Sequence, residues 1–123
     1  MILACAISAG IHGALAPGHF AEGKGAGLGF VAATIVLAAL VVAVTLRPAS
    51  ALALAGAAAV LAGLLGSYVL ATTTGVPVVH PEPEPVDGLA LVTKAIEAVG
   101  LVAASSLIRR PSVAANLLHL KGT

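Results

Sequence analysis

The chain has 123 residues, of which 59% are hydrophobic and 9% are charged. Soluble domains usually carry about a quarter charged residues, so this chain lacks the polar side chains that a water-facing surface requires. Its net charge of +1 gives no basic surface for nucleic acid, and its one cysteine, Cys5, excludes an internal disulfide. We therefore expect an integral membrane protein whose partner is the lipid bilayer.

Four apolar runs follow one another along the chain. A helix needs about 20 apolar residues to cross the hydrocarbon core of a bilayer. Runs of this kind cover about 1–16, 27–46, 49–71 and 89–108. Pro17 and Gly18 are expected to end the first run, because proline cannot continue the helical hydrogen bonds, and the lack of a basic region before that run argues against a signal peptide. The sequence predicts one all-α domain over 1–123, a four-transmembrane-helix bundle.

Charged side chains are distributed unequally between the connections. The second connection and the C-terminal tail carry basic residues alone, namely Arg47, Arg109, Arg110 and Lys121. The first and third connections are mainly acidic and carry Glu22, Lys24, Glu82, Glu84 and Asp87. Because basic residues are concentrated on the cytoplasmic side of a membrane, this distribution predicts an up-down-up-down bundle with both termini in the cytoplasm.

Histidine and carboxylate side chains gather near the predicted extracytoplasmic end. The group comprises His12, His19, Glu22 and His80. Imidazole and carboxylate groups are ligands for zinc and copper, so one interpretation is a transition-metal site formed by these four residues. The other interpretation is that they are solvated, with His12 hydrogen-bonded to a neighbouring helix. No HExxH or CxxC motif is present to decide between the two.

Three ionisable residues share one face of the fourth predicted helix: Asp87, Lys94 and Glu97. With a rise of 1.5 Å per residue, Glu97 lies roughly 15 Å below Asp87, near the middle of the membrane. Lys94 and Glu97 are three positions apart and can pair, which lowers the cost of burying both charges. The pattern indicates either a buried ion pair or a proton or ion relay that leads from the acidic loop to Glu97.

Small residues recur at helical spacing and allow close packing of helix backbones. Gly25 and Gly29 form a GxxxG pair at the start of the second run. A further row on the third run comprises Ala51, Ala55 and Ala59. These rows predict helix packing within the chain or, alternatively, a homodimer face.

Two stretches resemble a family of small, uncharacterised four-helix membrane proteins of bacteria. Residues 11–22 read IHGALAPGHFAE and are similar to its I-H-x-x-x-A-P-E-H-x-x-E signature. Residues 74–77 (TGVP) resemble its T-x-G-[IV]-P loop. Residues 84–89 (EPVDGL), followed by Lys94 and Glu97, resemble its E-P-V-x-x-L-D-L-x-x-K-x-x-E helix start.

The sequence departs from that family pattern at two places. Gly18 stands where the family usually has Glu, and Thr72 or Thr73 where it usually has Arg. A metal site that used the missing Glu would be weakened here. The resemblance implies the four-helix fold and a bacterial plasma membrane location, and it names no activity. It also implies that functional importance falls on His12, His19, Glu22 and Glu97.

The residues show no arrangement typical of an enzyme. Ser8, for example, has no His and carboxylate arrangement in the sequence that indicates a catalytic triad. We expect a small binding or accessory protein with an extracytoplasmic histidine and carboxylate cluster. The alternatives are a small ion- or proton-coupled transporter that uses Glu97, or a structural subunit of a larger membrane complex.

Overall fold

The computed structural model describes residues 1–76 and 81–109. Its four elements are all helices: α1 (Ile2–Glu22), α2 (Lys24–Leu46), α3 (Ala51–Thr73) and α4 (Gly88–Ile108). Each helix is long and apolar enough to cross a membrane. This confirms the all-α class and the four candidate spans expected from composition.

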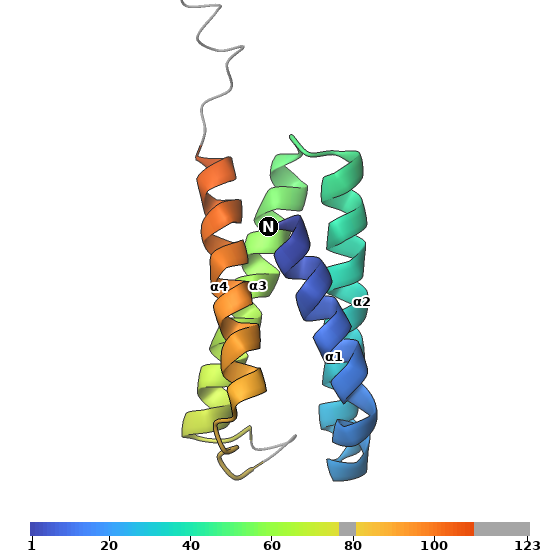
Figure 1. The fold of residues 1–123 in the computed structure, drawn as a ribbon, viewed down its shortest axis with the longest axis vertical. Coiled ribbons are helices and arrows are strands. Elements are labelled where there is room, and N and C mark those ends of the chain that lie inside the picture. Colours follow the sequence, from blue (N-terminus) through green and yellow to red (C-terminus); the bar gives the residue numbers. More distant parts are fainter. Residues whose placement is uncertain (77–80, 110–123) are drawn as a thin grey trace, which may run out of the picture.

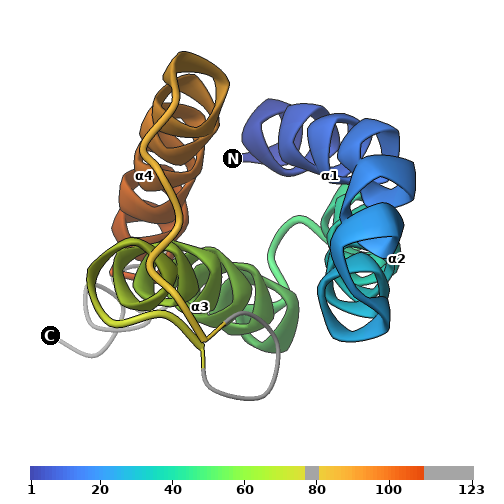
Figure 2. The same ribbon diagram turned by 90° about the horizontal axis from the view of Figure 1, so that it is seen from below.

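The helices form two hairpins that pack into a four-membered ring. Figure 1 shows the α1–α2 junction and the α3–α4 connection at one end of the bundle, and the α2–α3 turn at the other. Helix α1 packs most extensively on α2, and α3 on α4, while α1–α4 and α2–α3 contacts join the hairpins. The view along the bundle in Figure 2 shows the two pairs on opposite sides.

The first helix is longer than the sequence predicts. The expectation that Pro17 ends it is wrong, because α1 continues to Glu22 with Pro17 inside. Proline removes its own N–H donor and crowds the carbonyl of the preceding turn, which can kink a helix without ending it. Beyond it, the Phe20 ring lies against Gly27 of α2, where a Cβ atom would overlap the ring. This contact with α2 supports the turn after the proline, and Gly23 alone separates the two helices.

Side-chain caps mark the starts of the last two helices. The Ser50 hydroxyl accepts a 3.3 Å hydrogen bond from the Ala53 amide at the start of α3. The Asp87 carboxylate accepts a 2.8 Å bond from the Ala90 amide at the start of α4. Each cap satisfies an N–H group that has no partner within the helix. Asp87 is therefore engaged in holding the beginning of α4.

The interior is small, and most large apolar side chains face outward. Leu3, Leu46 and Leu52 are 76%, 75% and 85% exposed, which is the surface expected of helices surrounded by lipid. Inside, Gly100 of α4 lies so close to α1 that a Cβ atom there would be 2.7 Å from the Ala4 Cβ. Gly29, in contrast, has open space around it, so the predicted close packing at Gly25 and Gly29 does not involve Gly29 within this chain.

Candidate functional site

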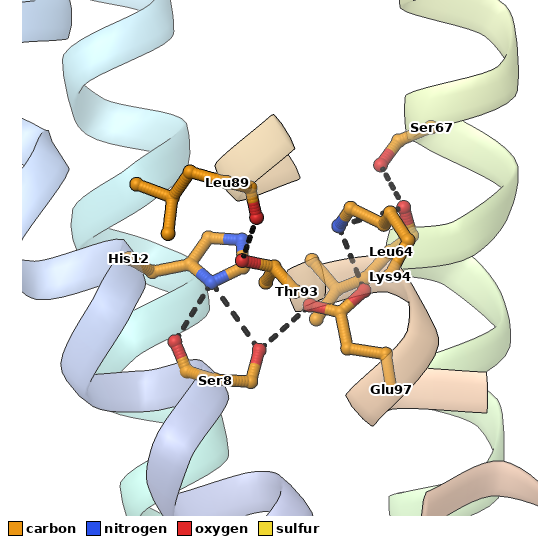
Figure 3. Close-up of polar contacts among 8 residues, drawn as sticks. All are labelled: Ser8, His12, Leu64, Ser67, Leu89, Thr93, Lys94 and Glu97. Carbon is orange, nitrogen blue, oxygen red and sulfur yellow. Dashed lines mark hydrogen bonds and ion pairs between the residues drawn. The ribbon is translucent and has the colours of Figure 1, made fainter. Parts of the chain in front are cut away.

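A buried ion pair and a serine hydroxyl join α1 to α4. Lys94 Nζ donates to Glu97 Oε2 at 2.7 Å, and Ser8 Oγ donates to Glu97 Oε1 at 2.6 Å (Figure 3). The Glu97 side chain is 0% exposed, so both of its oxygens are satisfied without water. A fully buried carboxylate is tolerable because it has a counter-charge and a hydrogen-bond donor.

Lys94 also contacts the third helix. Its ammonium group lies 3.5 Å from the Leu64 carbonyl oxygen and 5.6 Å from the centroid of the Tyr68 ring. The side chain is 16% exposed. The charge of Lys94 is thus shared between the Glu97 carboxylate, a carbonyl oxygen and an aromatic face, all of which favour a cation.

The imidazole of His12, on α1, adds to the hydrogen bonds that Ser8, Lys94 and Glu97 make with one another. His12 Nδ1 lies 2.9 Å from the Ser8 carbonyl oxygen and 3.3 Å from Ser8 Oγ. A carbonyl oxygen can only accept, so Nδ1 carries the proton in the neutral ring and Nε2 presents its lone pair. Within 1–76 and 81–109, no hydrogen bond reaches Nε2. One nitrogen of the ring, Nδ1, is therefore bound to α1, and the other, Nε2, can accept a hydrogen bond.

A cavity of about 380 Å³ lies between the two hairpins. Glu84 and Asp87 line it near the α3–α4 connection, and His12 and Lys94 line it farther along the bundle. Small-molecule sites typically measure about 300–1,000 Å³ and are mostly apolar with a few polar groups. This cavity has that size and that composition. The small residue Gly29 of α2 is part of its wall.

The two histidines of α1 both contact one aromatic ring. The His19 and Phe30 ring centroids are 3.8 Å apart and stacked at 26°, whereas those of His12 and Phe30 are 5.1 Å apart and tilted at 38°. Both imidazoles therefore pack on Phe30. Each makes its own polar contact on α1, His12 with the Ser8 carbonyl oxygen and His19 with the Glu22 carboxylate.

The predicted metal ligands are not brought together in the described part of the chain. His19 Nδ1 pairs with Glu22 Oε2 at 2.8 Å, one turn away on the same helix. No group of three or more His, Cys, Asp or Glu side chains within 1–76 and 81–109 could hold a metal ion. His80 lies outside the described residues. The described residues therefore give no support to a zinc or copper site.

Of the three ionisable residues predicted on one face of the fourth helix, two are in contact and the third lies apart from them. Lys94 and Glu97 are in direct contact, as their spacing of three predicts. Asp87 is seven positions from Lys94 and caps α4 instead of joining the pair, although it also lines the cavity. A continuous row of ionisable groups from Asp87 to Glu97 is therefore not formed by side-chain hydrogen bonds among these three residues.

Ser8 was considered only as a triad serine, and neither its contact with Glu97 nor the place of Phe30 in the site was predicted. Ser8 is four positions before His12, a spacing that places both on one face of a helix and could have signalled their contact. Their arrangement differs from a serine-hydrolase triad, in which the imidazole stands between serine and carboxylate. Here the serine stands between the imidazole of His12 and the carboxylate of Glu97. Ser8 is also 0% exposed.

The resemblance to small four-helix membrane proteins of bacteria stays a prediction. A scan against protein-family models finds no match for this chain, and searches of curated proteins and of solved structures find none either.

Proposed function

We propose that this chain is a multi-pass membrane protein that binds a small, mainly apolar ligand between its two hairpins. One observation supports this most: the cavity of about 380 Å³ includes both His12 and Lys94 in its wall. Ligand sites combine an apolar wall with a few polar groups that orient the ligand. The buried Glu97 balances the charge of Lys94, so Lys94 adds no unpaired charge to the wall.

The proposed orientation places both termini in the cytoplasm in an up-down-up-down arrangement. Arg47 follows α2 and Arg109 follows α4, and these two helix ends lie at the same end of the bundle (Figure 1). The cavity approaches the opposite end, where Glu84 and Asp87 lie. Basic residues are retained on the cytoplasmic side of a membrane. The ligand would therefore reach the cavity from the extracytoplasmic side of a bacterial plasma membrane.

Reporter fusions at the C-terminus test this orientation. Alkaline phosphatase is active only outside the cytoplasm, whereas a fluorescent protein exported in the unfolded state stays dark. We expect the phosphatase fusion to be inactive and the fluorescent fusion to be bright in a bacterial host. The opposite pair of results would show that the bundle has the reverse orientation in the membrane.

Ligand binding is tested by filling the cavity with a side chain. Gly29 lines the cavity, and a Cβ atom there meets nothing within 4 Å, so Gly29→Leu adds volume without a clash at Cβ. Gly63 of α3 is equally open and is not part of the cavity wall, which makes Gly63→Leu the matched control. Both variants introduce the same side chain, so they differ in its position and not in its chemistry.

The measurement is equilibrium dialysis of naphthalene against protein in lipid nanodiscs, with the uptake of empty nanodiscs subtracted. Wild type and Gly63→Leu should bind naphthalene saturably, and Gly29→Leu should bind it at least about tenfold more weakly, because the added side chain occupies the same space. Equal binding by the two variants would place any uptake in the lipid or on another surface.

The second candidate is proton-coupled transport through Glu97. The observation in its favour is the series of hydrogen bonds from His12 through Ser8 to Glu97, which links the cavity wall to a fully buried carboxylate. Intramembrane carboxylates and histidines are typical of proton relays. Proteoliposomes with an imposed pH gradient distinguish this candidate: Glu97→Gln should remove the proton flux of wild type, with Glu22→Gln as control. Flux that persists in Glu97→Gln would rule out a relay through that carboxylate.

A further inference from the structure

We infer that His12 Nε2 is the atom that recognises the ligand, and that the ligand is a planar aromatic molecule with a hydroxyl group. The inference rests on the proposed function, because it assigns chemistry to the same cavity. It goes further by stating the direction of the hydrogen bond. The ligand must donate a proton to the protein, and the protein atom that accepts it is Nε2 of His12.

The direction follows from the groups behind the imidazole. The Ser8 hydroxyl proton is directed to Glu97 Oε1 at 2.6 Å, so Ser8 Oγ can only accept from His12. The Ser8 carbonyl oxygen, 2.9 Å from Nδ1, also accepts. Two acceptors therefore face Nδ1, and the single proton of the neutral ring is on that nitrogen. The lone pair of Nε2 is left for a donor from outside the network.

The remaining wall of the cavity favours an aromatic ring. His19, Phe30 and Tyr68 all line it and present rings, and Phe30 already stacks with His19. Aromatic groups stack on one another with an offset or at an angle, which orients a planar ligand. Lys94 lines the same cavity, and its cation favours an electron-rich oxygen. A hydroxyl group attached to a ring meets both requirements, since its hydrogen faces Nε2 while its oxygen can face Lys94.

Other ligand chemistries fit this wall less well. A ketone, an ester or an ether has only acceptors and would place a lone pair against that of Nε2. A metal ion needs several ligands, and no group of three or more His, Cys, Asp or Glu side chains within 1–76 and 81–109 could hold one. An ether of the same ring has the shape of the hydroxyl compound but lacks the donor. The ether is therefore the most informative comparison.

The test compares 1-naphthol with 1-methoxynaphthalene, which share a ring system and differ in the O–H group. Dissociation constants are measured in nanodiscs by equilibrium dialysis, each corrected for uptake by empty nanodiscs. Wild type should bind 1-naphthol about three- to tenfold more tightly than 1-methoxynaphthalene, the ratio expected for one hydrogen bond in a buried site. His12→Phe, which keeps an aromatic ring but no acceptor, should abolish this ratio.

A control variant outside the cavity accounts for any general effect of a substitution. Ser106 is exposed and is not part of the cavity wall, so Ser106→Ala should keep the preference for 1-naphthol. If His12→Phe does not fold, the wild-type ratio still tests the inference, because equal affinity for the two compounds overturns it.

The outcomes distinguish the two proposals. Equal affinity of wild type for both compounds, with both weakened in Gly29→Leu, would overturn the donor inference and leave ligand binding intact. Tighter binding of 1-methoxynaphthalene would also overturn it, because the O–H group would then gain nothing from an acceptor in the cavity. If neither compound binds above the level of empty nanodiscs, the proposed function fails, and the inference fails with it.

Discussion

Ser8 Oγ donates a 2.6 Å hydrogen bond to Glu97 Oε1, joining residues that are 89 positions apart in the sequence. The bond links the α1–α2 hairpin to the α3–α4 hairpin inside the bundle (Figure 3). Both side chains are 0% exposed. A charged acceptor makes such a bond shorter and stronger than a bond between neutral groups, so this contact contributes to holding the hairpins together.

Ser8→Ala should therefore lower the free energy of unfolding by about 1–3 kcal/mol, because it leaves one oxygen of a buried carboxylate without its donor. Unfolding in mixed detergent micelles, followed by circular dichroism, measures the change. Ser106→Ala is the control, since the Ser106 hydroxyl is exposed and bonds to the Val102 carbonyl of its own helix at 2.8 Å. A Ser8→Ala effect no larger than that of the control would show that the bond contributes nothing to stability.

Lys94→Met should be more harmful, at about 3–5 kcal/mol, because it removes the counter-charge of the buried Glu97. Adding Glu97→Met to the same chain removes the orphaned charge, so the double variant should regain stability relative to Lys94→Met alone. A double-mutant cycle on the unfolding free energies provides the test. Strictly additive effects of the two substitutions would contradict an energetically coupled pair.

Gly27→Ala should destabilise the α1–α2 hairpin by about 1–3 kcal/mol, because its Cβ would overlap the Phe20 ring. Gly29→Ala is the matched control two positions away on α2, with open space at its Cβ. The control should be no less stable than wild type. Combining Gly27→Ala with Phe20→Ala should cost less than the sum of the two single substitutions, and a full sum would mean that the ring and the glycine do not interact.

Gly100→Ala should weaken the contact between α1 and α4, since the new Cβ would lie 2.7 Å from the Ala4 Cβ and 3.1 Å from Leu61 Cδ1. The helices must separate to relieve this overlap, which lengthens the Ser8–Glu97 bond. We expect a loss of about 1–3 kcal/mol in unfolding free energy, measured alongside Gly63→Ala. Combining Gly100→Ala with Ser8→Ala then checks the link: the combined loss should be smaller than the sum.

Three of the four predicted runs correspond closely to helices. The run 89–108 matches α4 (Gly88–Ile108), the run 49–71 corresponds to α3 (Ala51–Thr73), and the run 27–46 corresponds to α2 (Lys24–Leu46) apart from its first three residues. Continuous hydropathy, with Arg47 and Pro48 at the turn, contains that information locally. The extension of α1 beyond Pro17 was not predictable in this way, because it depends on a contact between Phe20 and a different helix.

The candidate site shows the same division between local and distant information. Lys94 and Glu97 were paired correctly because they are one helical turn apart. The contact of Ser8 with Glu97 depends on how α1 packs against α4, which no spacing along the chain records. The cavity has the same origin, since residues of all four helices form its wall.

The turn between α2 and α3 connects the two hairpins at the end of the bundle away from the α3–α4 connection (Figure 1). At the cavity end, the chain places no covalent restraint on the distance between one hairpin and the other. Entry of the proposed ligand at this end would compete with side-chain contacts alone, so we expect substitutions at Ser8 or Gly100 to change the rate of ligand exchange as well as stability. The two hairpins are therefore joined covalently through a single four-residue segment, 47–50, at the far end of the bundle.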